Sequence, residues 1–265
     1  MIAPLAHKSD TKSINSEIDE LNCTMEWCDD GIVLSTRKHG ESAAIITLLT
    51  RYHGRHSGLV RGGAGRRARG QYQPGNRLYA KWRGRLAEHL GTYICEMTEA
   101  VAAGLLEDAS RLAALSSACA TLDAALPERE VYTPIFEALV ILLDTLLHEK
   151  TDATLKSWPS VYAKWELGLL KELGFGLDLS ECVATGTTKY LTHVSPKSGC
   201  AVSANAAKPY QEKLLVLPKF FLHPGAAGTN EEVLAALQLT GHFLDRHVFC
   251  QHNNAKQPDA RNRFI

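Results

Sequence analysis

The stretch from residue 51 to residue 85 contains no aspartate and no glutamate. Ten of its 35 residues are lysine or arginine, a third of the chain's 29 basic residues, although the whole chain balances them with 29 acidic ones. Charge separated in this way creates a local positive field, for which a polyanion is the natural partner. The alternative interpretation is a solvated arginine-rich loop in front of a packed strand.

The chain also lacks any window of about 18 consecutive apolar residues, which argues against a membrane-spanning helix. Residues 1–24 hold four acids and no apolar segment, so we expect no secretory signal there. We expect these residues to form a polar, disordered extension, and Met25 is a candidate alternative start. The seven cysteines are odd in number and irregularly spaced, which argues against a disulfide scaffold and favours a reducing, cytoplasmic compartment.

Motifs of catalysis are missing as well. There is no phosphate-binding Gly-x-x-x-x-Gly-Lys loop, no His-Glu-x-x-His and no Gly-x-Ser-x-Gly, and the eleven histidines are scattered. A zinc ribbon needs two Cys-x-x-Cys pairs. Here Cys182 has Thr185 at the position of its second cysteine, and Ser195 and Ser198 stand where the other pair of cysteines would lie. Cys182 and Cys200 are therefore only weak candidates for metal ligands. We expect no enzyme activity, no cofactor and no structural zinc.

Charge and pattern divide the remaining chain into two domains. Residues 25–99 hold twelve basic and seven acidic residues, a net charge of +5, whereas residues 100–265 hold fifteen and eighteen, a net charge of −3. The first part consists of short β-rich runs with glycine turns, at 31–37, 44–49, 55–61, 77–85 and 91–97. Five closely spaced strands in about seventy residues predict a small barrel of the OB type. Gly62–Gly70 shows no periodicity and predicts a mobile loop.

The fourth predicted strand carries its charge on one face. Arg77, Tyr79, Lys81, Arg83 and Arg85 alternate with Leu78, Ala80 and Trp82, so the cations point outward and Trp82 enters the core. Cations on an outer face track phosphates, and exposed rings stack on bases. The predicted DNA-binding residues are Arg51, Arg55, Arg61, Arg66, Arg67, Arg69, Tyr72, Arg77, Tyr79, Lys81, Arg83 and Arg85.

The second part has helical periodicity. The predicted helices are 105–126, 134–148, 159–173 and 230–248, interrupted by two short hairpins between about 177 and 216. The fold class is therefore α+β: a five-stranded OB barrel followed by a helical domain with a small β-hairpin insertion, similar to a degenerate zinc ribbon.

Several short blocks resemble, in order, those of the RecO family of bacterial DNA repair and recombination mediators. They are Gly31-Ile-Val-Leu34, Gly40-Glu-Ser42, His53-Gly-Arg55, Val60-Arg-Gly62, Trp82-Arg-Gly84, the run from Trp165 to Phe175, Leu177-Asp-Leu-x-x-Cys182, Val194-Ser-Pro-Lys-Ser-Gly199 and Gly241-x-Phe-Leu-x-Arg-His247. The resemblance covers about residues 25–265, and the ordered set is more specific than any single block.

The resemblance implies an OB domain and a helical domain that often carries zinc. It also implies a nucleoid-associated mediator of the RecF pathway. Such a protein binds single- and double-stranded DNA, anneals strands, works with RecR, contacts single-stranded-DNA-binding protein and helps to load RecA. Of the four cysteine ligands found in zinc-binding members, this chain keeps only Cys182. Two other classes remain open, namely a DNA- or RNA-processing enzyme with an OB module and a scaffold whose basic barrel binds an acidic protein tail.

Overall fold

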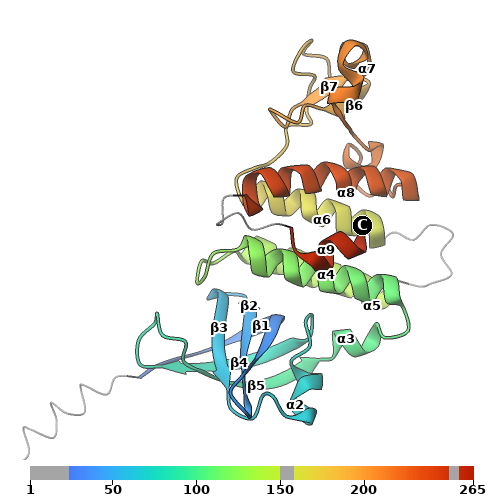
Figure 1. The fold of residues 1–265 in the computed structure, drawn as a ribbon. Coiled ribbons are helices and arrows are strands. Elements are labelled where there is room, and N and C mark those ends of the chain that lie inside the picture. Colours follow the sequence, from blue (N-terminus) through green and yellow to red (C-terminus); the bar gives the residue numbers. More distant parts are fainter. Residues whose placement is uncertain (1–23, 150–157, 251–256) are drawn as a thin grey trace, which may run out of the picture.

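The computed structural model describes residues 24–149, 158–250 and 257–265. A β-barrel occupies one end of the molecule, helices stack across the middle, and a small sheet lies at the opposite end (Figure 1). The predicted extension, residues 1–24, lies outside the described residues except for Thr24. Within the described parts of the chain, no helix has both the length and the apolar character needed to cross a membrane.

Five strands close the N-terminal barrel in the order β1-β2-β3-β5-β4, which confirms the predicted OB fold. They are β1 (Met25–His39), β2 (Ala43–Thr50), β3 (Gly54–Val60), β4 (Arg77–Gly84) and β5 (Thr92–Glu99). The first half of β1 pairs with β4 and the second half with β2. One long strand can serve both neighbours because a bulge between Val33 and Ser35 changes its register.

The seam between β3 and β5 is the weakest part of the barrel wall. The two strands run parallel and pair only at Leu59 and Thr92. The ring of Tyr93 fills the space above Gly58, where a Cβ atom would lie 2.3 Å from the ring. Buried side chains of all five strands, among them Leu48, Leu78 and Trp82, form the core beneath.

The prediction of a loop at Gly62–Gly70 is wrong from residue 66 onward: residues 62–65 form turns, but residues 66–71 form a short helix, α2 (Arg66–Gln71). The buried Asn76 holds its C-terminal end by donating its side-chain amide to the carbonyls of Gly70 and Gln71, at 2.9 and 3.1 Å. The Gln71 amide donates to the carbonyl of Cys95 on β5 at 2.9 Å. Ala68 packs on the barrel core. These tertiary contacts offset the poor helix propensity of Gly70.

Helices of the second domain form two layers (Figure 1). They are α3 (Val101–Gly104), α4 (Ala109–Ala125), α5 (Thr133–His148), α6 (Trp158–Glu172), α8 (Asn230–Leu244) and α9 (Asp259–Phe264), with a π-helical turn at Asp245–Phe249 after α8. The predicted helix at 105–126 begins later than expected, because the Asp108 carboxylate accepts the amides of Ser110 and Arg111 and so caps α4 at its first turn.

Barrel and helices share one apolar core. Ile32, Leu34 and Leu49 of the barrel pack with the buried side chains of the helices. The first residue of β3 also lies so close to the helical domain that only glycine fits. A Cβ atom at Gly54, whose φ is +67°, would lie 2.0 Å from the Glu130 carbonyl oxygen.

The predicted pair of hairpins is a single three-stranded sheet in the order β7-β6-β8. Its strands are β6 (Leu191–Val194), β7 (Ala201–Ser203) and β8 (Leu215–Val216), with α7 (Ala204–Ala207) and the 3₁₀ helix η1 (Lys208–Lys213) between the last two. We call residues 177–217 the hairpin module. It is tied to the end of α8, because Arg246 and His242 both contact the carbonyl of Pro196.

A buried ion pair fixes the C-terminal helix in the helical core. The Arg261 guanidinium donates to both Glu166 oxygens, at 2.7 and 2.8 Å, and to the Leu237 carbonyl at 2.9 Å. Thr240 donates its hydroxyl to the same carboxylate at 2.5 Å. Both partners of the ion pair are almost fully buried. Removing one charge would leave the other uncompensated in a low-dielectric site.

We expect R261A to lower the free energy of unfolding of the helical domain by about 3–5 kcal/mol, the usual cost of breaking a buried pair. Arg263 lies in the same helix and is exposed, so R263A is the matched control and should cost less than about 0.5 kcal/mol. Urea unfolding followed by circular dichroism measures both. Equal destabilisation by the two variants would contradict this role of Arg261.

His56 is buried in an aromatic cluster with Trp27, Trp82 and Tyr93. The Tyr93 hydroxyl lies 3.0 Å from His56 Nδ1. Burial, assisted by the charges of Arg129 and His53, lowers the pKa of His56 to about 4. The folded barrel therefore keeps this imidazole neutral at pH values where the unfolded chain takes up a proton.

The unfolded chain binds this proton below pH 6.5 and the folded chain only below about pH 4, so stability falls as the pH drops through that window. We expect His56 alone to account for a loss of at most about 3 kcal/mol. Urea unfolding of wild type and H56Q at several pH values isolates this contribution. A stability difference between the two proteins that does not change with pH would contradict it.

Candidate nucleic-acid interface

The outer face of β4 carries the predicted cations. Tyr79, Lys81 and Arg83 are exposed, while Leu78, Ala80 and Trp82 are buried, which confirms the predicted alternation. The side chains next to them come from the neighbouring strands. Residues 26, 28 and 30 of β1 lie opposite 83, 81 and 79, and residues 92, 94 and 96 of β5 lie opposite the same three positions.

These neighbours bring acids to the basic stretch, which the sequence of residues 51–85 does not reveal. Glu26 pairs with both Lys81 (2.9 Å) and Arg83 (3.2 Å). The hydrogen bond from Lys81 lowers the pKa of Glu26, and the same bond raises the pKa of Lys81. Both groups therefore stay ionised near neutral pH. A phosphate that approaches Lys81 or Arg83 must compete with the Glu26 carboxylate.

Three of the predicted DNA-binding arginines lie instead between the barrel and the helices. Arg55 donates to the Leu126 carbonyl at 2.7 Å and to Asp123 at 3.1 Å. Arg77 donates to Asp144 at 2.7 Å and to the Val140 carbonyl at 3.1 Å.

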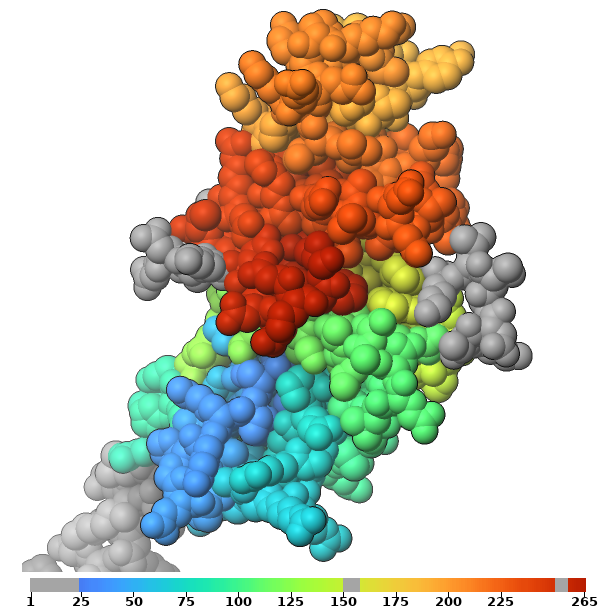
Figure 2. Space-filling model, turned by 45° about the vertical axis from the view of Figure 1, so that its right-hand side comes forward, coloured from blue at the N-terminus to red at the C-terminus, as the bar shows by residue number. Residues whose placement is uncertain are grey.

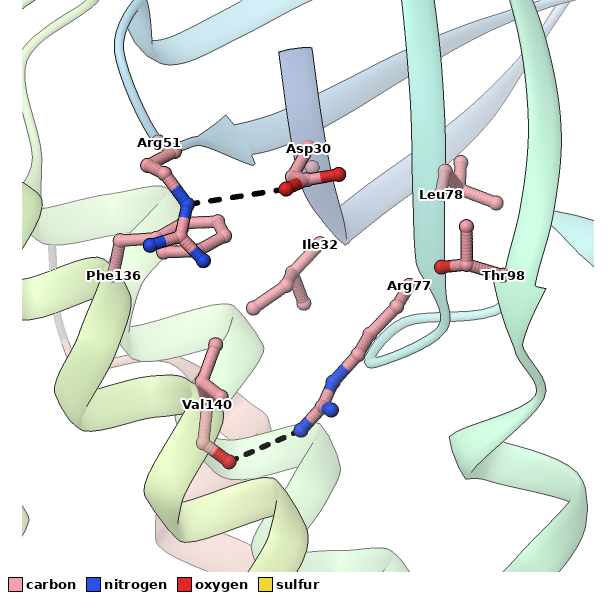
Figure 3. Close-up of a pocket in the computed structure, with 9 residues that line it drawn as sticks. Asp30, Ile32, Arg51, Arg77, Leu78, Thr98, Phe136 and Val140 are labelled. Carbon is pink, nitrogen blue, oxygen red and sulfur yellow. Dashed lines mark hydrogen bonds and ion pairs between the residues drawn. The ribbon is translucent and has the colours of Figure 1, made fainter.

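Arg51, the third of them, pairs with Glu137 and lies 4.7 Å from the centre of the Phe136 ring. Arg51 and Arg77 line opposite sides of a cavity of about 240 Å³ between the barrel and α5 (Figure 3). All three guanidinium groups have carboxylate partners, and less than a third of each side chain is exposed, so these arginines are not available to DNA.

Tyr72 is a correction to the predicted stacking residues. It follows α2 directly, and its ring is buried in the barrel core with 6% exposure, so no base can stack on it. Burial raises the pKa of its hydroxyl to about 12. Tyr79, the other predicted ring, is 47% exposed on the face of β4.

Five other predicted cations reach solvent after β3, on α2 and after β4, and none makes an ion pair with a described residue. They are Arg61, Arg66, Arg67, Arg69 and Arg85. A depression of about 590 Å³ lies at the seam between β3 and β5, with Arg61 and Arg83 among its lining residues and Ile94 and Cys95 from β5. Ile94 is 76% exposed. The lining of the depression thus combines two cations with exposed apolar surface from Ile94.

The hairpin module does not supply the ligands of a zinc ribbon. Among the described residues, no three histidine, cysteine or acidic side chains cluster closely enough to hold a metal ion. The Cys182 sulfur instead accepts the Ser203 amide at 3.2 Å. Burial alone would raise the pKa of this thiol, but hydrogen bonds from Ser203, Thr185 and Ala184 outweigh burial and lower the pKa to about 6. The residues present do not fit a four-ligand zinc site, and hydrogen bonds occupy the one retained thiol.

The architecture places the chain in the class of proteins that join an OB barrel to a helical domain. Two family models match it: the N-terminal domain of Recombination protein O over residues 25–101 and the C-terminal domain over residues 106–255. DNA repair protein RecO of Rhodospirillum centenum is 54% identical over 243 residues, covering 91% of this chain and 94% of the relative.

RecO of Nitrobacter hamburgensis is 49% identical over 245 residues, and RecO of Rhodospirillum rubrum is 45% identical over 242. Each match covers 91% of this chain, and the relatives are covered to 93% and 95%. The chain belongs to the RecO family, and its role lies in DNA repair and recombination.

The ion pairs of Glu26 generate a prediction. E26Q removes the carboxylate that competes with phosphate for Lys81 and Arg83, so we expect tighter binding of a single-stranded oligonucleotide, by about threefold to tenfold at low salt. Fluorescence anisotropy measures the affinity. Glu41 is exposed in the turn after β1, so E41Q is the control with the same change of charge. Equal gains in both variants would show an effect of net charge alone.

Proposed function

We propose that this chain is a recombination mediator that binds single- and double-stranded DNA on the barrel and anneals complementary strands. The single observation that carries the proposal is the set of exposed cations on β4, on α2 and around the seam. Two of these cations, Arg61 and Arg83, line a depression on the OB barrel together with the exposed Ile94. OB barrels commonly bind oligonucleotides across such a surface.

In this proposal Lys81, Arg83, Arg61 and the arginines of α2 contact phosphates. Such contacts position a strand without reading its sequence. Ile94 lies opposite Lys81 and lines the depression with Arg61 and Arg83, so it offers bases an apolar side chain. Tyr79 is the next residue along the same face of β4, between Asp30 and Glu96, and offers a ring. The expected binding is salt-sensitive and largely indifferent to sequence.

Annealing by this surface needs no covalent chemistry and no cofactor. Cations screen the repulsion between two phosphate backbones, which lowers the barrier to strand encounter. We further propose that the protein works with RecR, contacts single-stranded-DNA-binding protein and helps to load RecA in the RecF pathway. Membership of the RecO family is the support for these partners. Attachment to the coated strand would raise the effective concentration of the protein at its site of action.

The double variant K81A/R83A tests the phosphate contacts. Removing one phosphate-binding cation should reduce the slope of log affinity against log salt by about 0.7 for single strands, so we expect the double variant to reduce it by about 1.4. Both side chains are exposed, which predicts normal folding. Fluorescence anisotropy across a salt series measures the slope.

The control for this test is K171A/K219A, which removes two exposed lysines outside the barrel. It should leave the slope unchanged. A folded K81A/R83A protein with the wild-type slope would exclude β4 as the phosphate-binding face. Tight binding of an acidic peptide by a wild type that binds no DNA would favour a protein-binding scaffold instead.

A further inference from the structure

Two tyrosines stand exposed on the hairpin module. Tyr190 is 83% exposed, more than any other large apolar or aromatic side chain in the described parts of the chain, and Tyr210 is 60% exposed. They belong to connected segments. The Tyr190 carbonyl accepts the Ala204 amide at 2.9 Å, and Ala204 starts α7, which leads directly into η1 with Tyr210.

Tyr190 has a backbone conformation that tyrosine rarely adopts. Its φ is +57°, in the left-handed region, where a Cβ atom crowds the following carbonyl group. A strained conformation persists only where the surrounding structure imposes it. Here it directs a ring into solvent, with little burial of the ring in return. The strain is thus not explained by packing of the side chain.

Lysines accompany the two rings. Residues 187–213 contain four lysines and one acid, a net charge of +3. Lys189 precedes Tyr190, and Lys208 and Lys213 bound η1; all three are exposed. None of these three pairs with a carboxylate among the residues that the structure describes. In contrast to Lys81 on the barrel, these lysines face no competing acid in an ion pair.

The hairpin module and the barrel lie at opposite ends of the molecule. In Figure 2 the yellow-to-orange module and the blue-to-cyan barrel are separated by the helical domain. Two layers of packed helices amount to a separation of about 20 Å. A ligand bound at the module would therefore leave the basic face of the barrel free.

We propose that the tip formed by Lys189, Tyr190, Lys208, Tyr210 and Lys213 is a second binding site for single-stranded nucleic acid. Bases stack on the tyrosines and phosphates lie against the lysines, a combination that binds single strands without sequence preference. The inference rests on the proposed function, because it gives one molecule a site for a second strand or for a distant part of the same strand. Such bivalency raises the effective concentration of one strand near the other.

Photo-crosslinking locates the binding site directly. An oligothymidylate that carries 5-iodouracil is irradiated with the full-length protein, and the modified peptides are identified by mass spectrometry. We expect crosslinks at Tyr190 or Tyr210 in addition to those on the barrel. Crosslinks on the barrel alone would overturn the inference but support the proposed function. No crosslink and no binding anywhere would overturn both.

A bridging assay tests the function of the tip. Protein bound to an immobilised strand captures a second, labelled, non-complementary strand. The variant Y190G/K208A/K213A should bind the first strand as wild type does but capture the second at least about fivefold less, since it has one ring fewer to stack on bases and two cations fewer to bind phosphates. Glycine adopts the left-handed conformation without strain, so Y190G removes the ring and preserves the fold.

The matched control is Y52A/K171A/K219A, which removes an exposed tyrosine and two exposed lysines outside the tip. It should capture the second strand as wild type does. Unchanged capture by Y190G/K208A/K213A would overturn the inference, as would equal losses in the two variants. If polyglutamate displaces the labelled second strand from the tip and unlabelled oligothymidylate does not, the tip would be assigned to an acidic protein partner. That result would also overturn the inference.

Discussion

The ion pairs that Arg51, Arg55 and Arg77 make with α4 and α5 fix the barrel on the helical domain. Each guanidinium group is only partly exposed and faces a carboxylate of a helix. Together with the shared apolar core at Ile32, Leu34 and Leu49, they set the orientation of the barrel. This orientation leaves the outer face of β4 and the seam between β3 and β5 open to solvent. The arginines of one basic stretch thus divide into a group that holds the domains together and a group available to a ligand.

The available group is only partly neutralised. Glu26 occupies Lys81 and Arg83, whereas the arginines around α2 have no ion-pair partner in the described structure. Exposed ion pairs contribute little to stability, so a phosphate backbone can replace Glu26 at small cost. Binding of this kind depends on many weak phosphate contacts and is readily reversed. Reversibility suits a proposed mediator that must release the strand after annealing.

Periodic patterns predicted much of the fold because local geometry determines them. Alternation in β4 placed Trp82 in the core, and helical spacing located α5 and α6, including the end of α6 before Gly174. The family resemblance was confirmed by the family models and relatives. Long-range contacts could not be predicted in the same way. The helix α2 depends on the side chain of Asn76, which the glycine-rich composition conceals.

The same limit explains the corrections at the candidate site. Tyr72 was predicted to stack on bases because it lies among basic residues in the sequence, but its ring is buried in the barrel core. The acids that pair with the basic stretch come from residues 26, 30, 99, 123, 128, 137 and 144, which only the fold brings together. A basic stretch that contains no acids in the sequence can therefore still have acidic neighbours on the surface of the folded protein. The partners of a cation become visible only when strand register and domain contacts are known.

The central claim is that this division of the arginines determines where DNA binds. Arginine modification with phenylglyoxal, read by mass spectrometry with and without a single-stranded oligonucleotide, tests it most directly. The account predicts that Arg61, Arg66, Arg67, Arg69 and Arg83 react readily in the free protein and are protected by DNA. Arg51, Arg55 and Arg77 should react slowly under both conditions, because less than a third of each side chain is exposed, whereas the Arg83 side chain is 60% exposed. Protection of these three, with Arg66, Arg67 and Arg83 still reactive in the complex, would contradict the account.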